Sequence, residues 1–232
     1  MTTLLSLENL NYGYIDGSKR RVILDDLSYD FKAGTFYTIL GPSGSGKTTL
    51  LSLMGALEKT QGGTIRFDGK SLDDIGYSTY RRNHQAIVFQ QFNLIPYLNA
   101  HQNVLNVMHI TENDLPEDKS GTAMKLLERF GIVESKAKRP VSTLSGGEQQ
   151  RVAIARALAT NVKLILADEP TGNLDTATQK EIVRIFKSLA DTHGVCVIIV
   201  THSDEVAKTS DVQLRLKDGK LIEQSKGATY AG

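Results

Sequence analysis

The sequence predicts an α/β protein with a mostly parallel core sheet, an N-terminal antiparallel β lobe and an inserted helical lobe. Short, almost continuous apolar runs at residues 36–40, 86–89, 164–167 and 195–200 alternate with helical patterns. Such runs are typical of parallel strands that helices cover on both faces. Between residues 91 and 158 the strand signal vanishes and helical periodicity dominates, which predicts a helical insertion.

Antiparallel pairs are predicted where alternation or a tight turn replaces a continuous apolar run. Residues 5–10 alternate between apolar and polar side chains, and residues 64–70 contain an Asp-Gly turn. A second Asp-Gly turn, at residues 218–219, joins the segments 212–216 and 221–223 into a predicted hairpin.

Residues 1–232 are expected to fold as one domain. Helical patterns occupy residues 48–57, 152–159 and 178–190, and the acidic stretch 111–119 is predicted to be a surface loop. The expected limits are about 1–35 and 60–75 for the antiparallel lobe, about 36–90 and 159–232 for the α/β core, and about 91–158 for the helical lobe.

The composition argues against several kinds of protein. A net charge of +1 gives no sign of a nucleic-acid partner. The single cysteine, Cys196, lies in an apolar run and is predicted to be a buried, unreactive thiol. The N-terminus has no features of a signal peptide, and no apolar run approaches the roughly 18 residues that span a bilayer. A role in transport would therefore need a separate membrane subunit.

The first chemical motif is a glycine-rich loop between a predicted strand and a predicted helix. Its backbone N–H groups are suited to cradle the β- and γ-phosphates of a nucleotide. The glycine and serine residues of this loop are Gly41, Ser43, Gly44, Ser45 and Gly46. The ammonium group of Lys47 is predicted to contact the same phosphates, and the hydroxyl of Thr48 to bind Mg²⁺.

A second motif places two adjacent carboxylates, Asp168 and Glu169, at the end of an apolar strand. Adjacent carboxylates are costly at such a position unless a metal ion or a reaction uses them. We expect Asp168 to hold Mg²⁺, directly or through water, and Glu169 to orient and deprotonate an attacking water molecule.

The third motif, residues 144–151, is a second glycine-rich segment about a hundred residues after the first. Ser145 followed by Glu148 is a capping box and predicts the start of a helix. Gly146 and Gly147 leave the helix N-terminus bare, and such a terminus attracts anions. One chain therefore has two phosphate-binding helix starts, which suggests that two copies share each nucleotide.

Together these motifs resemble the ATP-binding cassette (ABC) family, whose signature reads LSGGQ, with Glu148 here in place of the usual glutamine. The resemblance implies an ATPase that uses ATP and Mg²⁺. It implies that Thr49 also contacts the nucleotide and that Asp175 contacts the phosphate loop of a partner copy. It places His202, at the end of a strand, at the γ-phosphate beside Glu169.

The resemblance leaves two positions ambiguous. Gln90 matches the family's glutamine that contacts both Mg²⁺ and water, although the neighbouring Gln91 is an alternative. Tyr14 matches the aromatic residue that stacks on adenine, although Tyr12 is close enough to take that role.

The resemblance also predicts partners. Two copies are expected to form a homodimer around two MgATP, and a membrane permease to dock near residues 90–98, unless that apolar segment is only a core loop. Residues 168–175 are similar to a bacterial branch that serves lipoprotein release and macrolide or peptide export. The expected location is the cytoplasmic face of the membrane.

Three other functions would also use a phosphate-binding loop. The chain has neither the long insertions nor the second cassette usual in ABC ATPases of DNA or ribosomes, and it lacks a guanine-reading motif of GTPases. An ATPase that drives a membrane signalling or cell-division complex without transport remains an alternative, because its catalytic residues would be identical.

Overall fold

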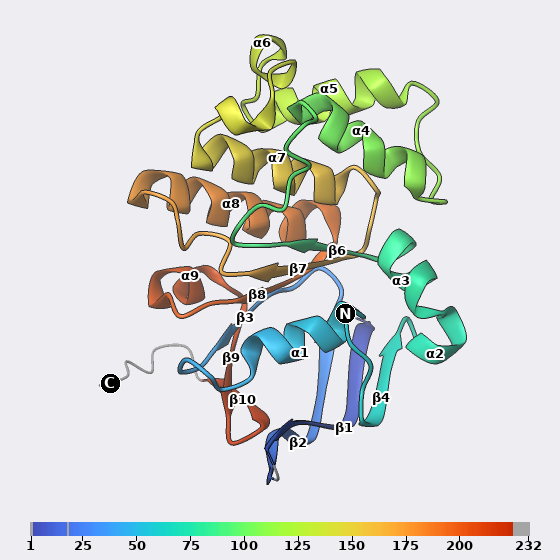
Figure 1. Ribbon diagram of the computed structural model, residues 1–232, viewed down its shortest axis with the longest axis vertical. Coiled ribbons are helices and arrows are strands. Elements are labelled where there is room, and N and C mark those ends of the chain that lie inside the picture. Colours follow the sequence, from blue (N-terminus) through green and yellow to red (C-terminus); the bar gives the residue numbers. More distant parts are fainter. Residues whose placement is uncertain (1, 18, 225–232) are drawn as a thin grey trace.

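Two β-sheets organise the protein in the computed structural model, which describes residues 2–17 and 19–224 (Figure 1). The first sheet is antiparallel throughout, with the order β2-β1-β4-β5. Its strands are β1 (Thr3–Asp16), β2 (Lys19–Lys32), β4 (Gly62–Phe67) and β5 (Lys70–Ser71).

The second sheet has the order β10-β9-β3-β8-β7-β6, and all of its strands except β10 run parallel. Its strands are β3 (Phe36–Leu40), β6 (Gln85–Val88), β7 (Leu164–Asp168), β8 (Cys196–Val200), β9 (Val212–Lys217) and β10 (Lys220–Gln224). The expected α/β class, with a mostly parallel sheet and an antiparallel N-terminal sheet, is therefore confirmed. The predicted C-terminal hairpin extends the parallel sheet, because β9 pairs with β3.

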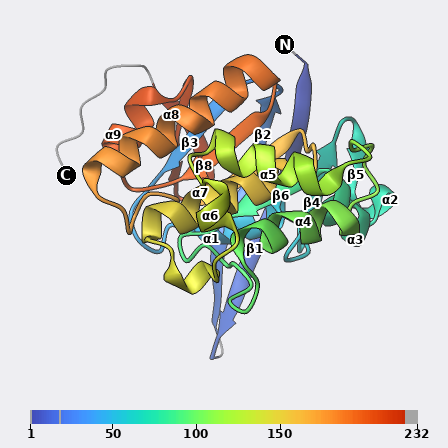
Figure 2. The ribbon, with the colours of Figure 1, turned by 90° about the horizontal axis from the view of Figure 1, so that it is seen from above.

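Helices follow most of the core strands, and a group of them lies on one side of the core sheet (Figures 1 and 2). The segment between residues 91 and 158 is helical, as predicted. The helices are α1 (Lys47–Met54), α2 (Leu72–Ile75), α3 (Tyr77–Asn83), α4 (Ala100–Ile110), α5 (Lys119–Arg129), α6 (Glu134–Ala137), the 3₁₀ turn η1 (Val141–Thr143), α7 (Gly146–Leu158), α8 (Thr176–His193) and α9 (Asp204–Thr209).

Both faces of the core sheet are buried, which explains its continuous apolar strands. Ile165 and Ala167 of β7 face the cluster that contains α8 and the helices α4, α5 and α7. Leu164 and Leu166, the alternate residues, face the cluster that contains α1 and the antiparallel sheet. Side chains alternate across a strand, so a strand between two apolar layers must be apolar at every position.

Two sequence expectations need correction. The helix predicted over residues 48–57 ends at Met54, because Ala56 has a left-handed φ of 55°, through which a right-handed helix cannot continue. The long strand β2 was not predicted. Its pairing with β1 is interrupted by register shifts, and Asp26 has a φ of 50°, so its apolar alternation is broken.

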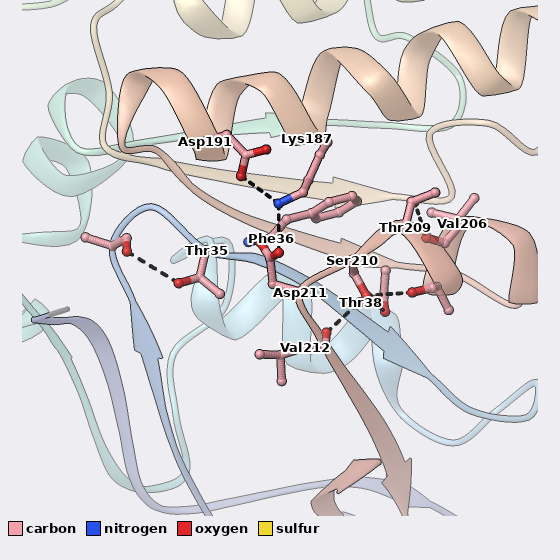
Figure 3. A network of polar contacts seen from close by, with 12 residues as sticks. Thr35, Phe36, Thr38, Lys187, Asp191, Val206, Thr209, Ser210, Asp211 and Val212 are labelled. Atoms are coloured by element: carbon pink, nitrogen blue, oxygen red, sulfur yellow. Dashed lines mark hydrogen bonds and ion pairs between the residues drawn. The ribbon is translucent and has the colours of Figure 1, made fainter. Parts of the chain in front are cut away.

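A polar network joins α8 to the core sheet (Figure 3). Lys187 of α8 donates to a carboxylate oxygen of Asp211 at 2.7 Å, and the other oxygen accepts from the Phe36 N–H at 3.0 Å. Below it, the hydroxyls of Thr38 and Ser210 lie 2.9 Å apart and are buried. These contacts hold the start of β9 and the helix α8 against β3. β3 is the strand that leads into the glycine-rich loop.

Among the residues that the structure describes, no helix combines the length and apolar character needed to cross a bilayer.

Candidate active site

The glycine-rich loop connects β3 to α1, as the sequence predicts. Gly46 immediately precedes the helix with a φ of 98°, a conformation that favours glycine. A Cβ atom there would come within 2.4 Å of Ile23 Cγ2, so the position has no room for a side chain. No side chain caps α1, so its first N–H groups point toward solvent as an anion site.

A cavity of about 460 Å³ opens over this loop. It brings together residues that lie far apart in the sequence, from β1, β2, the glycine-rich loop, the end of β7 and the segment after β8. Its lining comprises Tyr14, Arg21, Ile23, Ser43, Gly44, Gly46, Lys47, Thr48, Thr49, Asp168, Glu169 and His202. Gly41 and Ser45 belong to the same loop but do not line this cavity.

The Lys47 ammonium is held by the loop itself. It donates to the carbonyl oxygens of Gly41 at 2.8 Å and Pro42 at 3.0 Å. A phosphate group entering the cavity would offer these donors a charged acceptor in place of two neutral ones, and charge-assisted hydrogen bonds are the stronger kind.

The carboxyl group of Asp168 is placed for a divalent cation. Burial raises its pKa above the ordinary range, and the nearby charge of Glu169 adds to this, whereas a hydrogen bond from the Thr48 hydroxyl opposes it. A metal ion would offset the cost of holding this carboxylate charged. Carboxylate and hydroxyl oxygens are ligands that suit Mg²⁺, which usually binds one or two carboxylates together with phosphate oxygens. Thr48 and Asp168 therefore fit an Mg²⁺ site.

Two donors orient the carboxylate of Glu169. The Thr201 hydroxyl donates to Oε2 at 2.9 Å, and His202 Nδ1 lies 2.7 Å from Oε1. The backbone of Glu169 is left-handed, with a φ of 44°, and its N–H donates to Val200 at the end of β8. Strained backbone of this kind is found where a side chain must be aimed at a site. The Glu169 side chain is 17% exposed and that of His202 is 77% exposed.

The two candidate tyrosines have different environments. Tyr14 is 44% exposed, lines the cavity, and its hydroxyl lies 3.2 Å from Thr49 Oγ1. Tyr12 is only 8% exposed, and its hydroxyl donates to Glu58. That hydrogen bond, together with burial, raises the pKa of Tyr12 above its ordinary value. The geometry favours Tyr14 as the stacking residue. Tyr12 packs edge-on against it, with the two ring centroids 5.3 Å apart.

Gln90 lies outside the cavity lining. Its side-chain amide donates to Asn173 Oδ1 at 3.4 Å and sits against Gly172, where a Cβ would come within 2.9 Å of its Nε2. The amide thus joins the end of β6 to the loop that follows Glu169.

The second glycine-rich motif also lies away from the cavity, at the start of α7. The capping box is present: the Ser145 hydroxyl accepts from the Glu148 N–H at 3.3 Å, and Glu148 accepts from the Ser145 N–H at 2.8 Å. A Cβ on Gly146 would lie 3.7 Å from Phe92 Cζ, whereas one on Gly147 would be 2.7 Å from Thr178 Cγ2.

Asp175 caps α8 beside this motif. Its carboxylate accepts from the N–H groups of Ala177 and Thr178, both at 3.1 Å, and from the Thr178 hydroxyl at 2.6 Å. Within one copy, neither the signature residues nor Asp175 lines the cavity.

Two lining residues, Arg21 and Ile23, were not predicted from the sequence, and neither was Thr201, which orients Glu169 without lining the cavity. Arg21 and Ile23 belong to β2, the strand that the pattern did not reveal. Thr201 could have been suspected from its place between a parallel strand and His202, since ligands bind at the carboxyl ends of such strands.

Comparisons with known proteins identify the family of the chain. The sequence pattern of the family described as ABC transporter matches residues 24–172. The ABC transporter ATP-binding protein YclH of Bacillus subtilis is 46% identical over 219 residues, which are 94% of this chain and 96% of that protein. The macrolide export ATP-binding/permease protein MacB of Syntrophobacter fumaroxidans is 40% identical over 230 residues, which are 97% of this chain.

The fold is similar to the dimeric structure of MJ0796, an ABC transporter cassette of Methanocaldococcus jannaschii. The TM-score is 0.87 at 36% identity, with 97% of this chain and 100% of that chain covered. The chain belongs to the ABC transporter family, and it is an ATP-binding ATPase with the α/β P-loop fold. It spans 32% of the length of the MacB relative.

Proposed function

We propose that the cavity binds MgATP, with adenine on Tyr14 and the phosphates on the glycine-rich loop, Lys47 and Thr49. Thr48 and Asp168 would hold Mg²⁺, which neutralises charge on the phosphates, and Gln90 would approach the same ion. Glu169 takes a proton from water as the water oxygen bonds to the γ-phosphorus and the bond to ADP breaks. The hydrogen bonds from Thr201 and His202 to Glu169 support this role.

We further propose that two copies close head to tail around two MgATP. One observation carries this proposal: the signature residues Ser145 to Glu148 do not line the cavity of their own copy. A second copy would bring its Ser145 and Gly147, with its Asp175, to the nucleotide of the first. The solved MJ0796 cassette is dimeric, and another of its structures is a post-hydrolysis state with ADP and Pi. The γ-phosphate would hold the dimer closed, and hydrolysis would release it.

The test uses Glu169→Gln, which retains bound ATP, in analytical ultracentrifugation. Dimers are expected with saturating MgATP and monomers with MgADP. The matched control is Gly146→Asp in the same background, because a carboxylate at the start of α7 would repel a phosphate from the partner. This double variant should stay monomeric, and it should bind MgATP as tightly as Glu169→Gln does at protein concentrations too low for dimers to form. If the monomeric double variant no longer bound MgATP, the signature residues would instead belong to the nucleotide site of their own copy.

The ATPase is proposed to power a separate membrane permease at the cytoplasmic face of the membrane, for export of a peptide, drug or lipophilic compound. The relatives named for macrolide export, which carry ATP-binding and permease functions together, support this assignment. The proposed docking surface is residues 90–98, where Tyr97 is 83% exposed and Leu94 and Ile95 are half-buried. Exposed aromatic residues of this kind are typical of protein interfaces.

The membrane partner can be captured with Glu169→Gln in MgATP from detergent-solubilised membranes, with Tyr97→Ala as the control variant. We expect a permease that co-purifies with the first variant and less with the control. A captured complex that hydrolyses ATP in proteoliposomes without moving any substrate would favour the signalling function instead. Capture of DNA-bound or ribosomal proteins only would overturn the transport proposal.

A further inference from the structure

Arg21 lies next to the candidate nucleotide site and has no part in the roles proposed above. In the antiparallel pairing of β1 and β2 it is directly opposite Tyr14. Directly opposed residues project from the same face of a sheet. Both side chains are exposed and both line the cavity. Arg21 is thus attached beside the expected position of the base.

The guanidinium group of Arg21 reaches from this strand to the phosphate loop. Its Nη2 atom lies 3.7 Å from the point where a Cβ on Gly44 would be. Gly44 has a φ of 76° and stands in the turn between Ser43 and Ser45, whose backbone N–H groups are expected to bind phosphate. The charged end of Arg21 therefore lies at the phosphate end of the cavity, although its backbone lies at the base end.

The charges around the cavity leave Arg21 available for a ligand. Among the described residues, the Lys and Arg side chains that line it are Lys47 and Arg21. Lys47 donates to two loop carbonyls. The backbone of Arg21 pairs with Tyr14, but its guanidinium makes no hydrogen bond or ion pair among the side chains and backbone groups that the structure describes. A guanidinium has five N–H donors in a planar fork, a geometry that matches the oxygens of a phosphate group.

We propose that Arg21 binds the phosphate groups of the nucleotide from the side opposite Lys47 and so makes affinity depend on the number of phosphates. This inference rests on the proposed binding of MgATP in the cavity. Phosphate is favoured over the base as the contact because the guanidinium lies beside Gly44, while the exposed ring of Tyr14 is left for adenine. Arg21 acts here as a residue that determines specificity, and no step of hydrolysis passes through it.

The experiment compares the binding of MgATP, MgADP and adenosine to the full chain and to Arg21→Ala by titration calorimetry, with adenosine measured by competition. Arg21→Ala is expected to lower the affinity for MgATP roughly tenfold, the effect of about one charge-assisted hydrogen bond. The affinity for MgADP should fall less, and the affinity for adenosine should not change. Arg21→Lys should recover part of the loss, because it restores the charge but not the fork. Arg21 is exposed, so the variant should keep the wild-type melting temperature.

The matched control is Lys217→Ala. Lys217 is an exposed cation in the neighbouring hollow on the outer side of the phosphate loop, and it does not line the nucleotide cavity. The Lys217→Ala variant should bind MgATP like the wild type.

Equal losses of MgATP affinity in Arg21→Ala and Lys217→Ala would mean a general electrostatic effect and overturn the proposal. So would unchanged MgATP binding in Arg21→Ala, or a loss of adenosine as large as that of MgATP, which would indicate stacking on the base. A wild-type chain that binds no MgATP would instead contradict the proposed function itself.

Discussion

The two glycine-rich helix starts of this chain are built in opposite ways. Gly46 begins α1 in a left-handed conformation, and no side chain caps the helix. Ser145 begins α7 with a complete capping box, in which Glu148 also pairs with Lys136 at 2.5 Å. An uncapped helix start leaves its N–H groups for a ligand, whereas a capped one is stable without one. In the proposed function, the free N–H groups at the start of α1 receive the phosphates of the nucleotide, whereas the start of α7 is already stable before a second copy binds.

The proposed function places hydrolysis beside the start of α1, and Glu169→Gln is the variant with the largest expected effect on it. The amide cannot accept the proton of water, so turnover should fall by roughly 10²- to 10⁴-fold while the Kd for MgATP stays the same. Phosphate release and calorimetry measure the two quantities. The same change at Glu205, an exposed residue of α9, should alter neither. Similar turnover in Glu169→Gln and the wild type would remove Glu169 from the mechanism.

Paired glycine substitutions contrast the two helix starts directly. Gly46→Ala combines a left-handed φ with a Cβ 2.4 Å from Ile23, and it should lower the free energy of unfolding by about 1–3 kcal/mol. Gly146→Ala has ordinary space beside Phe92 and should leave that free energy unchanged or raise it by roughly 0.5 kcal/mol. Urea unfolding without nucleotide measures both. Equal changes in the free energy of unfolding would show that Gly46 and Gly146 are under the same steric and backbone constraint.

Removal of the cap tests whether α7 is stabilised in advance. Ser145→Ala deletes the acceptor of the Glu148 N–H and should cost about 1 kcal/mol of unfolding free energy. Ser43→Ala in the phosphate loop, where no side chain caps the helix, should cost less than about 0.5 kcal/mol. The same urea experiment applies. If the two serine variants were indistinguishable, the capping box would contribute nothing to stability.

The smallest effect concerns the pH dependence of that cap. The hydrogen bond from Lys136, followed by that from the Ser145 N–H, lowers the pKa of Glu148 from 4.5 to about 2. A lowered pKa means that the folded state favours the charged form. The stabilisation is therefore complete well above pH 4.5 and is lost as the pH falls from there toward 2. The wild type should be more stable than Glu148→Gln at pH 7, and the gap should narrow by pH 4. A gap that is constant with pH would contradict this assignment.

The fold could largely be predicted because its strands carry the pattern that their surroundings impose. β7 as far as Ala167 and all of β8 are apolar since both of their faces are buried, and Asp-Gly turns mark the antiparallel pairs β4–β5 and β9–β10. β2 was missed because it lies in a two-faced antiparallel sheet with irregular register, so neither period appears in its sequence. The helix predicted through residue 57 was too long because Ala56 adopts a left-handed backbone, which its residue type does not predict.

The sequence by itself determined the motifs whose residues are adjacent: the phosphate loop, the two carboxylates and the capping box at Ser145. Their geometry depends on local backbone, so residue types at fixed spacing are sufficient to define them. Tertiary structure alone decided that Tyr14 rather than Tyr12 faces the cavity, that Arg21 reaches the phosphate loop, and that Thr201 orients Glu169. These relations depend on strand register and on packing between distant segments, and neither can be predicted from the spacing of residues along the chain.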